Sequence, residues 1–130
     1  MAPDLHSFSV RVYYEDTDLA GIVYYANYLK FIERARTEWV RALGVDQAKL
    51  RAETGIVFAV RRVEADYLAP ARFDDVLEVR TAVQEKRRAS IVLQQDIVRG
   101  DTLIFHALVT LVALDARGRA VRLAMPRPGA

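Results

Sequence analysis

The sequence predicts an α+β domain in which an antiparallel sheet of about five strands carries one long helix. Three observations predict this class. Apolar residues between positions 25 and 43 recur at spacings of three and four, which is typical of an amphipathic helix. After Gly55 the apolar residues alternate with a period of two, which is typical of strands. Short turns join the later segments, whereas parallel strands need a crossover of about a dozen residues or more.

Each element follows from its own pattern. Residues 8–14 alternate and carry β-branched and aromatic side chains, which indicates a first strand. The helix is expected from about Tyr25 to Leu43, and Gly44 suits its C-terminal cap because glycine tolerates positive φ. A short second helix is expected around 46–53. The remaining strands are expected at 56–68, 75–86, 90–99, 102–115 and 120–124.

Length and composition restrict the class of protein. The 130 residues predict a single domain, 1–130, with a frayed Pro-rich tail at 125–130. A net charge of +2 does not argue for nucleic acid, and the absence of cysteine excludes disulfides and thiolate zinc sites. No signal peptide is evident, and the longest nearly apolar run, 103–114, is too short for a membrane-spanning helix. We therefore expect a soluble, cytoplasmic protein whose exposed sheet edges favour pairing with another copy.

Three acidic residues, Glu15, Asp16 and Asp18, gather just before the long helix. A calcium loop is disfavoured, because its fifth position is Ala20 and its twelfth is Asn27 instead of a bidentate glutamate. Asp18 also precedes the helical pattern by about seven residues, so a helix cap explains it poorly. Asp16 suits a local turn role. Loop structure and a catalytic carboxylate remain open for the cluster.

The hypothesis of a catalytic site rests on carboxylates and backbone N–H donors. The chain has only two histidines, His6 and His106, and no triad around the acidic cluster is visible. His106 lies in an apolar strand, where a satisfied core or interface histidine is favoured. Asp18 would supply a carboxylate, and Gly21 would allow a ligand close to the backbone. A helix N-terminus offers free N–H groups that can polarise a carbonyl oxygen.

The stretch "VRVYYEDTDLAGIVYYANYLKFIERARTEWVRALG" (10–44) resembles the signature of the 4-hydroxybenzoyl-CoA thioesterase family, most closely its Tol–Pal-associated acyl-CoA thioesterases. The likeness continues through "DYLAPARFDDVLEV" (66–79) and "KRRASIVLQQ" (86–95). It implies a hotdog fold, an antiparallel sheet wrapped around a long central helix. It also implies dimers, often paired into tetramers, with sites at the subunit interface. The implied reaction is hydrolysis of an acyl-CoA to a free acid and coenzyme A, without metal or organic cofactor.

The resemblance also assigns site residues. Asp18 takes the place of the family's catalytic aspartate, a nucleophile on the thioester carbonyl or a general base for water. The backbone N–H of Tyr25, with Gly21 shaping the approach, takes the place of the oxyanion donor. Many Tol–Pal-associated relatives have a histidine where this chain has Tyr25, which leaves the acyl-group preference open. For an acyl pocket, Tyr24 and Tyr28 are candidates, although aromatic residues at such spacings are often core.

Coenzyme A phosphates are expected to meet Arg87, Arg88 and Ser90, with a solvated turn as the alternative. Glu33 lies eight residues after Tyr25, or ~12 Å along a helix, which is too far to share a reacting carbon with Asp18. We interpret Glu33 as structural. A hydratase is disfavoured because no histidine accompanies the carboxylate. A non-catalytic module that binds acyl-CoA or acyl carrier protein is the alternative function.

Overall fold

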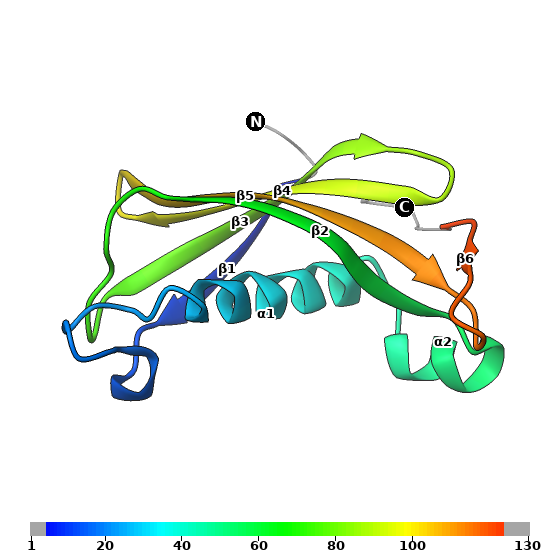
Figure 1. Cartoon of the computed structure of the whole chain (residues 1–130), viewed down its shortest axis with the longest axis horizontal. Helices are drawn as coiled ribbons and strands as arrows, with labels where there is room; N and C mark the ends of the chain where they lie inside the picture. The colour runs from blue at the N-terminus through cyan, green and yellow to red at the C-terminus, as the bar shows by residue number, and fades with distance from the viewer. Residues whose placement is uncertain (1–4, 124–130) are drawn as a thin grey trace.

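The structure, a computed structural model, describes residues 5–123. A six-stranded antiparallel sheet carries the long helix α1 on one face (Figure 1). The strand order is β1-β3-β4-β5-β2, and β6 also pairs with β5. The elements are β1 (His6–Arg11), the 3-10 helix η1 (Tyr14–Asp16), α1 (Asn27–Ala42), α2 (Gln47–Thr54), β2 (Val57–Tyr67), β3 (Val76–Lys86), β4 (Ser90–Arg99), β5 (Thr102–Leu114) and β6 (Ala120–Val121).

The expected α+β class, with the hotdog arrangement of a helix against an antiparallel sheet, is confirmed. Most boundaries differ by one to three residues, and two of these differences bear on the candidate site. The first strand ends at Arg11 and not at Tyr14, because Tyr14–Asp16 turns away as η1. The long helix begins at Asn27 and not at Tyr25, because residues before it form a turn in which the Asn27 N–H donates to the Tyr24 carbonyl. The expected tail 125–130 lies outside the described residues.

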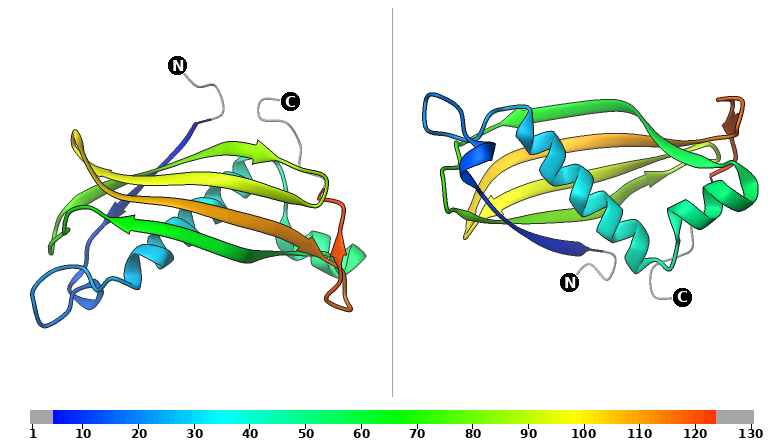
Figure 2. Two further views of the ribbon diagram at one scale, coloured as in Figure 1. Left: turned by 45° about the horizontal axis from the view of Figure 1, so that its top comes forward. Right: turned by 90° about the horizontal axis from the view of Figure 1, so that it is seen from below.

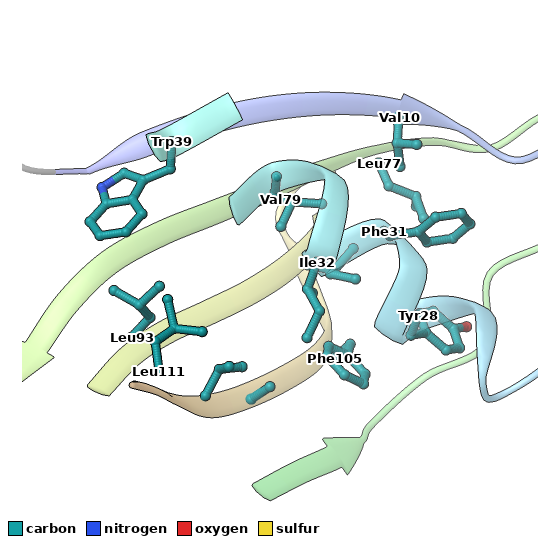
Figure 3. Packing of buried hydrophobic residues seen from close by; sticks show 14 of the residues in the cluster. Val10, Tyr28, Phe31, Ile32, Trp39, Leu77, Val79, Leu93, Phe105 and Leu111 are labelled. Carbon is teal, nitrogen blue, oxygen red and sulfur yellow. The ribbon is translucent and has the colours of Figure 1, made fainter. Parts of the chain in front are cut away.

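The core lies between α1 and the sheet. The helix crosses the sheet diagonally, with its first turn near the end of β2 (Figure 2, right). Its buried residues recur at spacings of three and four and meet inward-facing residues of β3, β4 and β5 (Figure 3). The large side chains that are almost fully buried include Phe31, Ile32, Leu77, Ile91, Leu93, Ile97, Ile104 and Phe105. Burying one such side chain stabilises the fold by about 1.5–3 kcal/mol.

A polar network crosses this core beneath α1. The fully buried Gln95 accepts an N–H from Arg36 at 2.9 Å. Its amide nitrogen donates to the Ile32 carbonyl and the Thr81 hydroxyl, each at 2.9 Å. Burial lowers the pKa of the Arg36 guanidinium, and the Glu33 carboxylate opposes that shift. Because the groups of Gln95 are paired, the network fixes the rotation of α1 on the sheet at little desolvation cost.

One long strand remains uncovered at the edge of the sheet. β2 ends the strand order, and all of its residues are half-buried or exposed. Val60 and Val63 are 45% and 40% exposed, although their cross-strand partners Leu111 and Val109 are buried in the core. A bulge interrupts the β2–β5 register between Val60 and Arg62. This edge therefore offers both unpaired backbone groups and exposed apolar side chains.

Replacing Gln95 by leucine should lower the free energy of unfolding by about 1–3 kcal/mol, because Arg36 and Thr81 lose their buried partner. Urea denaturation followed by circular dichroism, at matched protein concentration, measures the change. The neighbouring Gln94→Leu is the control, since Gln94 is half-buried and its side chain donates to Asp96. Equal destabilisation by the two substitutions would contradict the importance of the buried network.

Candidate active site

Asp16 organises the loop between β1 and α1, and this residue is only 6% exposed. One carboxylate oxygen accepts the Tyr13 N–H at 2.8 Å, and the other accepts the Asn27 side-chain amide at 2.9 Å. The Asp16 carbonyl accepts the Tyr24 N–H at 2.9 Å. Asp16 therefore connects the residue just after β1 (Tyr13), the end of the loop (Tyr24) and the first residue of α1 (Asn27). This agrees with the local structural role expected from the sequence.

Asp18 differs from Asp16, because it lies at the exposed tip of the loop. Its Oδ1 accepts the Ala20 N–H at 2.9 Å, and its carbonyl accepts the Gly21 N–H at 2.9 Å. Its own N–H donates to the Ile22 carbonyl at 2.9 Å. Gly21 has a φ of +80°, which a residue with a side chain rarely adopts, and space beside it is open. The result is a fixed turn that presents an exposed carboxylate.

Asp18 does not cap α1, because the residue before that helix is Ala26 and no side chain caps it. Tyr25 lies in the turn just before the helix, and not in it. Within residues 5–123, the Tyr25 N–H donates to no protein acceptor. A free backbone donor thus follows the loop that carries the Asp18 carboxylate.

Aromatic rings surround this turn. The Tyr24 and Tyr25 ring centroids lie 4.9 Å apart, and Tyr25 meets Tyr67 of β2 edge-on at 6.2 Å. The pKa of the Tyr24 hydroxyl is raised, mainly by a hydrogen bond with Tyr25, with smaller contributions from the charge of Tyr25, from burial and from Asp18. Tyr24, Tyr25 and Tyr67 therefore form a cluster of rings beside this turn.

Tyr28 takes a different position, in the core. It is 4% exposed, and its ring stacks on Phe105 at 5.3 Å. Its hydroxyl accepts the Ala71 N–H at 3.1 Å, and burial raises its pKa. Tyr67 contacts both Tyr28 and Tyr25, and so connects the core to the exposed rings. Burial and the neighbouring Tyr25 raise the pKa of Tyr67.

Sequence reasoning did not select Tyr67. The alternation along β2 places Tyr67 on the same face as Ala65 and Val63, so its inward orientation was readable from the sequence. Its contact with Tyr25 was not, because 42 positions separate the two residues and only the sheet topology brings them together.

The basic turn between β3 and β4 lies at the opposite end of the sheet from the Asp18 loop (Figure 1). Arg87 donates to both carboxylate oxygens of Glu85, at 2.9 and 3.0 Å, and this pairing lowers the pKa of Glu85. Arg88 is exposed, and no carboxylate of residues 5–123 pairs with it. Ser90 is buried at the start of β4. One chain alone does not bring these residues to Asp18.

Two further polar residues have local partners. Glu33 accepts the Thr37 hydroxyl at 2.8 Å, one turn along α1, so its hydrogen-bond partner lies within the helix. His106 Nδ1 lies 2.6 Å from Asp96 Oδ1, which agrees with a satisfied histidine. Its neighbours Phe105 and Ala107 are in the core, so His106 itself lies on the sheet face opposite α1.

Residues 5–123 contain no group of three or more His, Cys, Asp or Glu side chains that could hold a metal ion. No helix among them is long and apolar enough to cross a membrane.

Comparison with known proteins identifies the family. Residues 20–106 match the Thioesterase superfamily. The chain is 42% identical to the acyl-CoA thioesterase YbgC of Haemophilus influenzae over 93% of this chain and 88% of that protein. It is 46% identical to the acyl-CoA thioester hydrolase YbgC of Escherichia coli, over 88% and 86% of the two chains.

A similar architecture occurs in a solved structure of 4-hydroxybenzoyl-CoA thioesterase, an aspartate-to-asparagine mutant in complex with 4-hydroxybenzoyl-CoA. It superposes with a TM-score of 0.87 at 26% identity, over 93% of this chain and 94% of that one. With the family match over most of the chain and relatives above 40% identity, the conclusion is direct: this chain belongs to the thioesterase superfamily.

Proposed function

We propose that this protein hydrolyses acyl-CoA thioesters to a free acid and coenzyme A, with short-chain or aromatic acyl groups as the substrates, and that it acts in the cytoplasm. The observation that carries the proposal is the loop between β1 and α1. There, a fixed turn exposes the Asp18 carboxylate, and the free N–H of Tyr25 follows it. A base or nucleophile and a carbonyl-polarising donor are the two groups that this reaction needs.

Asp18 serves in one of two ways. As a general base, it takes a proton from water while the water oxygen attacks the thioester carbon. As a nucleophile, it forms an acyl–aspartyl anhydride, which water then hydrolyses. In both routes the carbonyl oxygen gains negative charge and the Tyr25 N–H stabilises it. The C–S bond then breaks, and the coenzyme A sulfur leaves as a thiolate that takes up a proton. Neither route uses a metal or an organic cofactor.

The acyl group lies, in this proposal, against the tyrosines beside the loop. Tyr24 and Tyr25 are exposed, and Tyr67 adds a third ring at the end of β2. Gly21 leaves open space next to the loop, so that the ester can approach the backbone closely. Tyr28, which is buried and fixed by Ala71, closes the core side of this aromatic wall.

The coenzyme A phosphates require a second copy of the chain in this proposal. β3 contains 11 residues, so the residues at its two ends lie about 33 Å apart. Asp18 and the turn of Arg87, Arg88 and Ser90 belong to opposite ends. The exposed edge of β2 provides the contact for a dimer, and dimers pair further into a tetramer. One subunit then supplies Asp18 and its partner supplies the basic turn.

A non-catalytic module that binds acyl-CoA or acyl carrier protein is the second candidate. One observation favours it: Asp18 Oδ1 already accepts the Ala20 N–H, as an aspartate with a purely structural role in a turn would. The two candidates differ in turnover, which the first experiment measures.

Asp18→Asn should reduce kcat by about 10²- to 10⁴-fold, because an amide can act neither as base nor as nucleophile. Release of free thiol from short-chain, long-chain and aromatic acyl-CoA esters measures the reaction. The control is Glu15→Gln, which changes an exposed acid in the adjacent 3-10 helix and should leave kcat unchanged. Turnover that survives Asp18→Asn contradicts the assigned role. Tight acyl-CoA binding without turnover in the wild type favours the binding module.

Arg88→Gln should raise KM for acyl-CoA by about 10- to 150-fold, because the loss of a charge-assisted hydrogen bond costs about 1.5–3 kcal/mol. Arg87→Gln should raise it less, since Glu85 already holds the Arg87 guanidinium. Initial rates across a range of substrate concentrations separate KM from kcat. Arg80→Gln is the control, because Arg80 pairs with Glu78 within the strand. Equal KM values for Arg80→Gln and Arg88→Gln would contradict the assignment of the basic turn to the coenzyme A site.

Val63→Lys should convert the dimer into monomers and abolish turnover, because a charge on the inward face of the edge strand opposes pairing. Sedimentation velocity measures the oligomeric state, and thiol release measures activity. Val76→Lys is the matched control, since Val76 is a comparably exposed valine on β3. A wild-type protein that sediments as an active monomer would overturn the two-chain site.

A further inference from the structure

The pairing of Asp16 with Asn27 is a buried contact between two polar side chains near the proposed catalytic groups. The two side chains meet at 2.9 Å in a buried position, and both residues are 9% exposed or less. Asp16 is not a candidate for chemistry, because its two carboxylate oxygens are occupied by Tyr13 and Asn27. Nothing in the proposed reaction uses it directly. It nevertheless lies in the same loop, two residues before Asp18.

We propose that the Asp16–Asn27 hydrogen bond is the positioning contact that sets the Asp18 carboxylate and the Tyr25 N–H at their working separation. This inference rests on the proposed thioesterase function. Asp16 precedes Asp18 by two residues, and its carbonyl holds the N–H of Tyr24, the residue just before Tyr25. Its side chain then reaches the first residue of α1. One residue thus holds both flanks of the loop and the start of the helix.

The remaining contacts of the loop hold it to itself more than to the helix. An isolated bridge joins Thr17 to Val23, and the Asp18 N–H meets the Ile22 carbonyl. A second bridge, Ile22 to Arg72, ties the tip to the segment before β3. Besides the backbone bond from the Asn27 N–H to the Tyr24 carbonyl, the Asp16 side chain provides the hydrogen bond that joins this loop to α1. Its loss would let the turn with Asp18 shift relative to Tyr25, and a displacement of about 1 Å can cost 10²-fold in rate.

The chemistry of the pair permits a test by exchange. A carboxylate only accepts hydrogen bonds, whereas an amide both donates and accepts. Asn27→Asp places two carboxylates face to face, which removes the bond and adds repulsion. In the double variant Asp16→Asn with Asn27→Asp, the residue-16 amide oxygen accepts the Tyr13 N–H and its amide nitrogen donates to the residue-27 carboxylate. The exchange therefore restores every contact with the roles reversed.

We expect Asn27→Asp to lower kcat about 100-fold with KM changed by less than threefold, and the double exchange to recover kcat to within about fivefold of the wild type. Thiol release is measured well below the unfolding temperature of each variant. Thr37→Val is the control, since it removes another side-chain hydrogen bond from α1, at an exposed position. It should leave kcat unchanged.

Amide hydrogen exchange provides a readout independent of turnover. The Ala20 and Asp18 N–H groups, both bonded within the loop, should lose protection in Asn27→Asp and regain it in the double exchange. An inactive wild type would end the proposed function, and the exchange data would then decide whether the pair orders the loop. An Asn27→Asp protein with wild-type kcat and protection, or a double exchange as slow and as unprotected as Asn27→Asp, would overturn the inference.

Discussion

The arrangement of the whole structure depends on one constraint: the single long helix is narrower than the sheet that it covers. The packing of α1 against the inward face of β3, β4 and β5 forms the core. A helix with its side chains is about 10–12 Å wide, whereas five strands at about 4.8 Å spacing extend over about 19 Å. α1 therefore cannot cover the whole face. Its diagonal course leaves the inward side of β2 exposed, and there Val60 and Val63 keep their accessible surface.

This incomplete cover also places the proposed site. The first turn of α1 comes close to the end of β2, so Tyr25 meets Tyr67 at the border between the covered and uncovered parts of the sheet. Two acidic residues of the loop before the helix differ in burial. Asp16 is buried and both of its carboxylate oxygens accept structural hydrogen bonds, whereas Asp18 faces solvent from a fixed turn. A rigid support and an exposed reactive group two residues apart are what a pre-organised site requires.

The sequence was sufficient for the features that depend on local periodicity. The long helix, its glycine-capped end and the strands after Gly55 were predicted with boundaries that mostly differ by one or two residues. The roles of Asp16 and Asp18 could be distinguished in part, because the distance of Asp18 from the helical pattern already argued against its capping the helix. Long-range pairing was not readable: β1 joins β3, some 70 positions away, and Tyr67 reaches Tyr25 only through the sheet. The η1 turn at Tyr14 was also missed, because alternation alone does not show where a strand bends away.

The two edges of the sheet differ, and the difference limits how far copies of the chain can add to one another. β2 is 11 residues long and carries a bulge between Val60 and Arg62, whereas β1 at the other edge has only six residues. In the proposed dimer, pairing of one β2 with a second β2 would use the same surface on both partners, so the long edge would not be available to a third chain. The short strand at the opposite side is a poor template. The fold thus carries its own protection against open-ended fibre growth.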